Sequence, residues 1–347
     1  MTPTIGVADV LARSRRAIHP ALSASIDRLA PEIRQIATYH MGWTDTSGNP
    51  VDAPGGKGVR PTMAILGAEA AWAEPEVGVP GGVAVELVHN FSLIHDDIID
   101  TDTERHHRPT VWSAFGVGPA IVAGDALQVL AHQVLLEASP ETGPAASAAL
   151  ADATAAMIAG QADDIAFEKR RNVSVEQCTA MSAAKTGALL GCASSIGAIL
   201  AGAPDATVGA LRDYGRHLGL AFQAVDDLLG IWGDPDTTGK PAGTDLVLRK
   251  KSMPVVSALA AGGREADELR TLILGPEDVT TPLEALDADQ VERARYLVEA
   301  CGGREWTAVR AKANLDAALG ALERVRLSAI PHRDLADLAV YVVERDF

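Results

Sequence analysis

The spacing of apolar residues is the feature that most constrains how this chain can fold. Over most of the sequence they recur three and four positions apart, the helical interval, whereas the few β-branched clusters are short and lack hairpin signals. The pattern predicts an all-α protein. We expect helices over residues 7–38, 61–75, 79–102, 119–136, 144–169, 174–203, 206–231, 252–262, 289–301 and 304–327, with a last helix after Arg333.

Glycine and proline residues separate these predicted helices, for example at Pro54-Gly55-Gly56, Pro80-Gly81-Gly82 and Gly143-Pro144. A chain of 347 residues could hold two or three average domains, or one large helical domain. No linker marks independent halves, and the sequence has no repeat of solenoid period. We therefore predict a single domain that spans residues 1–347.

The net charge limits which binding partners we expect, and the cysteine content indicates the cellular compartment. Thirty basic against 46 acidic residues give a formal net charge of −16, which opposes non-specific binding to nucleic acid or to an anionic membrane surface. We expect no nucleic-acid partner. The three cysteines lack CxxC spacing and indicate neither a disulfide framework nor a structural zinc site, so a cytoplasmic location is expected.

One uncharged stretch, Thr186 to Pro204, is long enough to be tested as a membrane span. It is rich in Gly, Ala and Ser, and it lacks the aromatic residues that mark membrane interfaces. A tightly packed core helix explains this composition better, and we expect no membrane span.

Two pairs of adjacent aspartates, Asp96-Asp97 and Asp226-Asp227, lie deep inside apolar helical segments. On the first segment, Asp96 and Asp100 share a helix face. Adjacent carboxylates in apolar surroundings repel one another unless a cation compensates them. Oxygen ligands at helical spacing suit Mg²⁺, which keeps several waters and bridges to substrate phosphates.

The second pair decides between two interpretations of the first. Alone, Asp96-Asp97 could be a surface acid cluster. The same pattern recurs at Asp226-Asp227, which makes a chance surface cluster a much weaker explanation. If the two helix faces meet across a bundle, their carboxylates share a partly dry cavity, which persists only with divalent ions and an anionic ligand between them. A diphosphate ester fits that demand.

With the Gly55-Gly56-Lys57-Gly58-Val59-Arg60-Pro61 element and the Tyr341 to Arg345 tail, these motifs resemble the trans-isoprenyl diphosphate synthases, also called the polyprenyl synthetase family. The resemblance covers nearly the whole chain. It implies an all-α fold, a single large antiparallel helical bundle around a central cavity, usually in a homodimer. It also implies three Mg²⁺ ions per active site, held against an allylic diphosphate by Asp96, Asp97, Asp100, Asp226 and Asp227.

The same resemblance assigns the substrate ligands. Isopentenyl diphosphate would be bound by Lys57, Arg60, His89 and His106, and the allylic diphosphate by Arg105, Lys185, Thr186, Gln223, Lys240 and Lys250. Direct catalytic roles fall to Asp96, Asp97, Asp226, Lys185 and Lys240. Judged alone, the Lys57 to Arg60 element could be a plain surface turn. A nucleotide-binding P-loop is excluded, because the required glycine spacing and the following Ser or Thr are absent.

Two positions depart from the family pattern. The family has two consecutive arginines after the first acidic motif, and here His106 replaces the second, which exchanges a permanent forked cation for a weaker, pH-dependent donor. Arg108 could substitute for it. Where the second motif usually has a third aspartate, this chain has Gly230, so a metal would depend on Asp226 with Asp227 in support.

The expected reaction is a head-to-tail condensation. Mg²⁺ and basic side chains would stabilise the leaving diphosphate, so that the allylic C–O bond ionises and the double bond of isopentenyl diphosphate attacks the cation. The predicted function is therefore a Mg-dependent prenyltransferase of isoprenoid biosynthesis. The alternatives are a terpene cyclase or other lyase on the same fold, which His106 and Gly230 would suit, and a non-catalytic regulatory subunit.

Product length should follow from where the cavity ends. Phe91 lies five residues before Asp96, about 7.5 Å along the helix axis. Its ring could form the floor of the cavity, where the growing chain must stop, while Ser92 beside it is small. By resemblance, this combination without an insertion between Asp97 and Asp100 suits geranylgeranyl diphosphate (C20). Farnesyl (C15) and geranylfarnesyl (C25) diphosphate stay open, because Phe91 could equally be a core residue.

Overall fold

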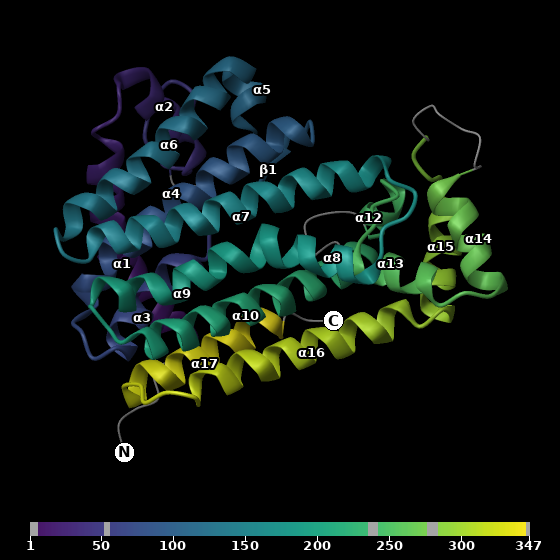
Figure 1. The fold of residues 1–347 in the computed structure, drawn as a ribbon. Coiled ribbons are helices and arrows are strands. Elements are labelled where there is room, and N and C mark those ends of the chain that lie inside the picture. Colours follow the sequence, from purple (N-terminus) through teal and green to yellow (C-terminus); the bar gives the residue numbers. More distant parts are fainter. Residues whose placement is uncertain (1–5, 52–55, 235–241, 276–283, 345–347) are drawn as a thin grey trace. The chain divides into compact units, whose positions relative to one another are not determined.

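The computed structural model describes residues 6–51, 56–234, 242–275 and 284–344. Within these residues the chain is almost entirely helical, as Figure 1 shows, which confirms the predicted all-α fold class. The chain forms two compact units. Unit 1 comprises Met1–Thr154, Cys192–Arg212 and Arg324–Leu335, and unit 2 comprises Ala155–Gly191, Asp213–Glu323 and Ala336–Phe347. That residues 1–347 form a single domain stays a prediction.

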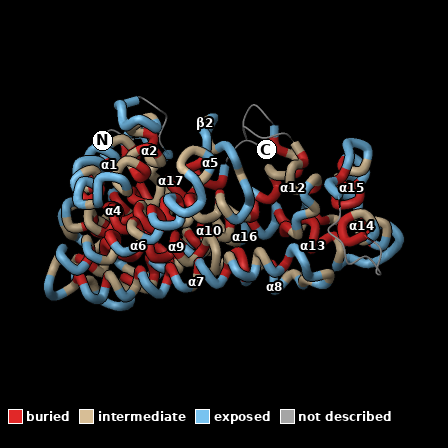
Figure 2. Tube along the Cα trace, turned by 90° about the horizontal axis from the view of Figure 1, so that it is seen from above, coloured by how far each residue is buried: buried red, intermediate tan, exposed pale blue. Residues whose placement is uncertain are grey.

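Unit 1 is built around helix α4, which packs along its length against α3 and α6. Its elements are α1 (Val7–Ile26), α2 (Pro31–His40), α3 (Val59–Ala70), α4 (Pro75–Ile99), β1 (Glu104–Arg105), β2 (Arg108–Pro109), α5 (Val111–Phe115) and α6 (Val117–Ala138). The side chains of Ile65, Leu87, Ile94 and Leu127 are almost completely inaccessible. These helices therefore form a continuous apolar core, which appears as the red segments of α4 and α6 in Figure 2.

Small residues let α4 lie close to its neighbours. A Cβ atom on Gly78 would lie 2.7 Å from the backbone oxygen of Ala64, so a larger residue would push α4 away from α3. On the other side, the ring of His95 fills the space above Gly124 of α6, where a Cβ atom would lie 2.3 Å from Nε2. These contacts fix the helix that carries the first acidic motif.

Unit 2 has its core where helix α13 packs against α14, α15 and α16. Its own elements are α8 (Val175–Ser182), the π-helix η1 (Ala183–Gly187), α12 (Thr244–Val247), α13 (Met253–Ala260), α14 (Arg264–Leu274), α15 (Ala288–Ala300) and α16 (Gly303–Leu322). Val255, Leu269 and Leu297 are fully buried there. Four helices contribute residues to both units: α7 (Gly143–Lys169), α9 (Ala188–Leu200), α10 (Asp205–Trp232) and α17 (Ala329–Val343).

Most helix boundaries agree with the predicted ranges within a few residues, with some differences. The predicted helix over 7–38 is two helices: α1 ends at Ile26, and α2 begins at Pro31, whose missing N–H is tolerated in the first turn of a helix. The helix predicted over 174–203 contains the π-helical turn η1. Helices α5, α12 and α14 lie outside the predicted ranges.

The hairpin of β1 and β2 also lies where no strand is predicted. His106 and His107 form its turn with φ angles of 50° and 60°, the left-handed values that a two-residue type I′ turn needs. Such turns usually carry Asn or Gly, so the sequence gives no signal for this one.

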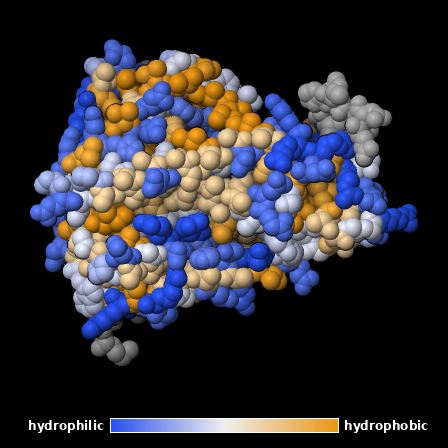
Figure 3. Space-filling model, in the orientation of Figure 1, coloured by the Kyte–Doolittle hydropathy of each residue, from blue (hydrophilic) through white to orange (hydrophobic). Residues whose placement is uncertain are grey.

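Three helices are long and apolar enough to cross a membrane by length and composition: Pro75–Ile99, Val117–Ala138 and Val175–Leu200. In the first and third, 61% and 67% of the most apolar window is buried inside the protein, but in α6 the share is 39%. The apolar side chains of α6 therefore reach the surface, and Figure 3 shows hydrophobic atoms gathered along this helix.

Candidate functional site

Asp97 of the first acidic motif lines a cavity of about 250 Å³ in unit 1. Side chains reach this unit 1 cavity from α1, α2, α4 and the hairpin. Four of the residues predicted from the sequence line it: His89, Asp97, Arg105 and His106. Apolar side chains such as Leu93 complete the wall.

Arg60 contacts His89 beside this cavity. Helix α3 begins after Gly58, whose φ of 68° is left-handed, so Arg60 stands in the first helical turn. Its Nη1 donates to Nε2 of His89 over 3.2 Å, and because a guanidinium has no acceptor, the proton of a neutral His89 lies on Nδ1. Burial, reinforced by neighbouring cations including Arg60, holds the pKa of His89 well below its usual value. The ring is therefore neutral at physiological pH.

A carboxyl group lies near the same arginine. Glu86 lines the cavity one helical turn before Asn90, whose amide lies 3.4 Å from Oε1. Burial raises the pKa of Glu86, and the charge of Arg60 and the amide of Asn90 offset this rise only in part. The predicted ligand Lys57 precedes α3 and is exposed.

Asp97 is the buried member of the first acidic motif. Its Oδ1 accepts from Nε and Nη2 of Arg105 at 2.9 and 2.8 Å, whereas its buried Oδ2 has no hydrogen-bond partner among the described residues. Burial raises the pKa of Asp97, and the Arg105 guanidinium offsets this rise only in part. At the C-terminal end of α4, Asp96 is half-buried and Asp100 is exposed. The motif thus has one carboxylate oriented by an arginine and two that are open to solvent.

The position where the family has a second arginine lies on the hairpin turn. His106 is exposed there and lines the unit 1 cavity. Arg108, the candidate substitute, also lines the cavity, but its nitrogens donate to the backbone oxygens of Tyr39 (3.2 Å) and Thr44 (2.8 Å). Its guanidinium stacks 4.4 Å from the centre of the Tyr39 ring. Arg108 therefore anchors the hairpin to the end of α2, and fewer of its N–H groups remain to bind a ligand.

Sequence reasoning misses three basic groups of this cavity: Arg15 and His19 from α1, and His40 from α2. Burial, and after it the charge of Arg105, lowers the pKa of His40 to about 3. Arg15 lies close to the loop before α3, with Nη2 3.4 Å from the backbone oxygen of Gly56. These residues belong to no motif, and only the packing of α1 and α2 brings them to the site.

The two predicted product-length residues lie next to the acidic motif on α4. The buried ring of Phe91 packs edge-on against His95 with 4.9 Å between ring centres. Ser92 is half-buried, and its hydroxyl donates to the backbone oxygen of His89 over 2.8 Å. Phe91 thus has a packing partner, so its role as a floor stays a prediction.

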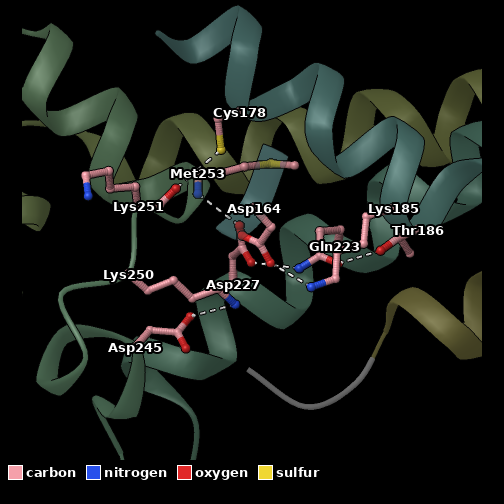
Figure 4. Close-up of polar contacts among 10 residues, drawn as sticks. All are labelled: Asp164, Cys178, Lys185, Thr186, Gln223, Asp227, Asp245, Lys250, Lys251 and Met253. Carbon is pink, nitrogen blue, oxygen red and sulfur yellow. Dashed lines mark hydrogen bonds and ion pairs between the residues drawn. The ribbon is translucent and has the colours of Figure 1, made fainter. Parts of the chain in front are cut away.

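The second acidic motif belongs to unit 2, where a group of polar side chains surrounds Asp227 (Figure 4). We call this group the unit 2 cluster. It consists of Asp164, Lys185, Thr186, Gln223, Asp227, Asp245, Lys250 and the backbone N–H of Met253.

Lys185 and Thr186 lie on the π-helical turn η1, close to α7. A Cβ atom on Gly160 of α7 would lie 2.4 Å from the backbone nitrogen of Lys185, so the two backbones nearly touch. At this crossing, Nζ of Lys185 pairs with Oδ2 of Asp164 at 2.6 Å. Turns of this kind are rare inside helices and occur frequently at functional sites.

A chain of hydrogen bonds runs from Thr186 to the second acidic motif. The hydroxyl of Thr186 donates to Oε1 of Gln223 (2.8 Å), and Nε2 of Gln223 donates to Oδ1 of Asp227 (2.9 Å). The backbone N–H of Met253 donates to the other oxygen of Asp227 over 2.9 Å. Burial raises the pKa of Asp227 to about 6. Asp227 therefore anchors α10 to α13 rather than facing solvent.

The remaining predicted residues of unit 2 differ in accessibility. Asp226 is exposed, next to the buried Asp227. Nζ of Lys250 lies 4.0 Å from Oδ2 of Asp245. Burial would lower the pKa of Lys250, but the carboxylates around it, with Asp245 first, outweigh burial and raise it. Lys240 lies outside the described residues.

The donor chemistry of both motifs fits Mg²⁺. Each has one buried carboxylate and one next to it that is nearer to solvent, and the unpartnered Oδ2 of Asp97 is an acceptor that a hydrated cation could satisfy. In the part of the chain that the structure describes, no three His, Cys, Asp or Glu side chains group closely enough to hold a metal alone. Mg²⁺ needs few protein ligands, because water and substrate phosphates complete its octahedron. That the two motifs share one site stays a prediction.

Comparison with known proteins agrees with this chemistry. The family model described as Polyprenyl synthetase matches residues 43–286. A (2E,6E)-farnesyl diphosphate synthase of Mycobacterium tuberculosis is 45% identical over 337 residues, which cover 97% of this chain and 92% of the relative. A geranylgeranyl diphosphate synthase of the same organism is 39% identical over 338 residues, with 97% and 93% covered.

A solved structure extends the likeness to the fold. The polyprenyl synthetase from Streptomyces coelicolor A3(2) is 51% identical, with a TM-score of 0.91 over 97% of this chain and 99% of that chain. The resemblance seen in the acidic motifs and in the Lys57 to Arg60 element is therefore confirmed. The chain belongs to the polyprenyl synthetase family, whose members are transferases that act on isoprenyl diphosphates.

Proposed function

We propose that this protein condenses isopentenyl diphosphate head-to-tail with an allylic diphosphate and that its main product is geranylgeranyl diphosphate (C20). One observation supports the proposal most. Each acidic motif has one aspartate fixed inside the protein, Asp97 by Arg105 and Asp227 by Gln223 and Met253, and an adjacent aspartate nearer to solvent. The arrangement orients accessible carboxylates rigidly while leaving them available to a metal-bound diphosphate.

The allylic diphosphate would be bound by residues of both motifs. Asp96, Asp100 and Asp226 would hold Mg²⁺ with Asp97 and Asp227 in support, three ions in all by family resemblance. When bound, Mg²⁺ supplies the positive charge that neutralises the leaving diphosphate. Lys185 and Lys250 are cations already oriented by carboxylates, so they can turn to a phosphate oxygen without a large change in position. No side-chain nucleophile is needed, because the C–O bond breaks by ionisation.

Isopentenyl diphosphate would be bound at the unit 1 cavity. Arg60 and Lys57 would bind its diphosphate, and the neutral His89, with its proton on Nδ1, would orient it rather than add a third charge. Arg15 extends this cationic wall. The double bond of isopentenyl diphosphate then attacks the allylic carbon, and the released diphosphate accepts the proton.

The apolar part of the site would protect the allylic cation from water. Leu93 lines the unit 1 cavity, and Ile94 and Phe91 lie buried on the same helix. Water is excluded from such surroundings, and a growing hydrocarbon chain gains free energy by burial there.

The C20 product rests on Phe91, buried five residues before Asp96, with the small Ser92 beside it. Farnesyl diphosphate (C15) is the second candidate, because the farnesyl diphosphate synthase relative is 45% identical and the geranylgeranyl diphosphate synthase 39%. We further propose a cytoplasmic homodimer. The exposed apolar side of α6 supports the dimer.

Product analysis of the purified full-length chain tests the proposal. Dimethylallyl, geranyl and farnesyl diphosphate should each be elongated to C20 in the presence of isopentenyl diphosphate and Mg²⁺, and a chelator should abolish turnover. Accumulation of C15 would favour the second candidate.

The same assay separates the other functions. Release of diphosphate without isopentenyl diphosphate would identify a cyclase or lyase. No turnover by the pure chain, with activity restored by a partner subunit, would identify a regulatory subunit.

A further inference from the structure

One side of helix α1 faces the unit 1 cavity. Four residues of this helix line the cavity: Arg15, Ile18, His19 and Leu22. The last three lie three, four and seven positions after the first, so all four share one helix face. The next residue, Arg16, points about 100° away from Arg15 around the helix axis and is exposed. Of these two neighbouring arginines, Arg15 is therefore the one on the cavity side of α1.

Most of the other basic groups around the cavity are already engaged by the protein. Arg105 pairs with Asp97, and Arg108 donates to two backbone oxygens. Burial is the main cause that lowers the pKa of His40 and of His89, so both rings are uncharged at physiological pH. The cavity therefore offers a diphosphate fewer positive charges than its residue types suggest.

Two further features reduce the positive charge of this cavity. Burial raises the pKa of Glu86, and the charge of Arg60 offsets part of this rise, so the two groups lie close enough to interact. Part of the charge of Arg60 is thus balanced within the protein. On the hairpin turn, His106 lines the cavity where an arginine would supply a permanent charge. A diphosphate carries several negative charges, so a further permanent cation would strengthen its binding.

The guanidinium of Arg15 lies near the predicted diphosphate ligands and is weakly held. Its Nη2 lies 3.4 Å from the backbone oxygen of Gly56, which is long for a hydrogen bond. Gly56 directly precedes Lys57, so Arg15 reaches the loop that carries this predicted ligand. By contrast, the ring of His19 packs against Trp43 with 4.9 Å between ring centres. Arg15 is therefore the residue of α1 best suited to bind an anion in the cavity.

We propose that Arg15 is a further ligand of isopentenyl diphosphate, and that it supplies from α1 the permanent cation that the hairpin turn lacks at His106. This inference deepens the proposed function and rests on it, because the ligand is the diphosphate of that substrate. A guanidinium can donate two N–H groups to one phosphate. Because the side chain of Arg15 is exposed and weakly held, it can turn to the substrate with little loss of contacts inside the protein.

A simpler role for Arg15 is to brace the loop before α3 through the backbone oxygen of Gly56. The two roles differ in what can replace the arginine. A brace depends on a donor beside Gly56, which a side chain on the hairpin turn would not restore. A diphosphate ligand depends on positive charge in the cavity, and position 106 lines the same cavity. An arginine introduced there can supply that charge.

The experiment measures the binding of isopentenyl diphosphate without turnover. The full-length chain is loaded with Mg²⁺ and geranyl thiolodiphosphate, an allylic analogue that ionises poorly, and is titrated with isopentenyl diphosphate by calorimetry. We expect Arg15→Gln to bind it about 5-fold to 20-fold more weakly than the wild type. Arg15→Lys should lie between the two, because it keeps the charge and loses the fork. In steady-state assays, Arg15→Gln should raise the KM for isopentenyl diphosphate and leave the KM for geranyl diphosphate unchanged.

Two further variants make the outcome specific. Arg16→Gln is the matched control, because it removes the same charge from the adjacent, exposed position, and it should bind isopentenyl diphosphate as the wild type does. In the double variant Arg15→Gln with His106→Arg, the permanent cation is supplied from the hairpin turn instead. We expect this double variant to bind isopentenyl diphosphate more tightly than Arg15→Gln alone.

Three results would overturn the role of Arg15 while leaving the proposed function standing: wild-type affinity in Arg15→Gln, equal weakening in Arg16→Gln, or a double variant no better than Arg15→Gln. A wild-type chain that neither binds isopentenyl diphosphate nor consumes it in the elongation assay would overturn both. Melting temperatures of the ligand-free variants report whether each chain is folded, so a loss of affinity in a folded Arg15→Gln chain counts in favour of the inference.

Discussion

Within each acidic motif, the two adjacent aspartates have different surroundings. Asp227 has both oxygens hydrogen-bonded inside the protein, and Asp97 has one oxygen on Arg105, whereas Asp226 is exposed and Asp96 half-buried. Neighbouring residues on a helix point about 100° apart, so one side chain is buried by packing while the next is nearer to solvent. The buried member orients the helix, and the accessible member is the one that the proposed function assigns to the metal.

Asp227 should make the metal-free protein less stable as the pH rises. Burial raises the pKa of Asp227 from 3.8 to about 6, so the folded state holds this proton more tightly than the unfolded state. Its contribution is complete below pH 3.8 and is lost as the pH rises to about 6. At 1.36 kcal/mol per pKa unit, the loss is on the order of 3 kcal/mol. Urea unfolding in chelator between pH 4 and pH 7 measures it as the difference between wild type and Asp227→Asn.

Asp226→Asn is the matched control for this pH dependence, because Asp226 is adjacent in sequence but exposed. Its free energy of unfolding should follow the wild-type pH profile. If Asp227→Asn follows that profile as well, the burial of Asp227 does not govern the pH dependence of the free energy of unfolding.

Phe91→Ala should lengthen the products beyond C20, because removing the ring deepens the site five residues below Asp96. Chromatography of the elongation products measures the change. The variant should also lose about 3–5 kcal/mol of stability, since the ring is buried. Leu135→Ala on α6, also fully buried, controls for destabilisation alone and should keep the wild-type products. An unchanged product spectrum in Phe91→Ala would reject its role as the floor.

How far the site could be predicted differs from residue to residue. The aspartates and Lys57, Arg60 and His89 belong to motifs, so the sequence identifies them. Arg15 and His40 line the unit 1 cavity without any motif, because only the packing of α1 and α2 brings them there. From the sequence, Arg108 could substitute for the family arginine that His106 replaces. Residue spacing does not predict that Arg108 instead donates to two backbone oxygens.

At the scale of elements, apolar periodicity predicts the long helices but not the local departures that shape the site. The hairpin turn at His106 and His107 requires left-handed φ angles that histidine seldom adopts, so the residue types there do not predict a turn. The π-helical turn η1 contains ordinary residues as well. Each departure depends on tertiary contacts, and each carries residues that the proposed function uses.

The close approach of α7 and η1 can be tested at Gly160. Its substitution by Ala places a Cβ 2.4 Å from the backbone nitrogen of Lys185, and a backbone atom cannot move aside as a side chain can. We expect Gly160→Ala to lower the free energy of unfolding by about 1–3 kcal/mol. Gly320→Ala, on α16 with open space around it, should be neutral or stabilising in the same urea experiment. Equal stability of the two variants would show that the helices separate without cost.

At the scale of the whole molecule, the surface of α6 is the feature that the packing of unit 1 leaves unexplained. Val122, Val129 and Leu136 are 50%, 59% and 52% exposed and follow one another at intervals of seven residues, so they form one apolar stripe along the helix. An exposed stripe of this kind favours association, and a two-fold axis would bring the stripe of one copy against that of another.

Val129→Asp should therefore dissociate the proposed homodimer. A charge in the middle of the stripe would lose its hydration on association without gaining a partner, which costs several kcal/mol per copy. Light scattering coupled to size-exclusion chromatography measures the molar mass, expected to fall from two chains to one. Val309→Asp on α16 is the matched control, because Val309 is also 59% exposed and lies outside the stripe. If Val129→Asp keeps the wild-type mass, or if the wild type is already monomeric, α6 is not the dimer surface, and its apolar side chains require another partner.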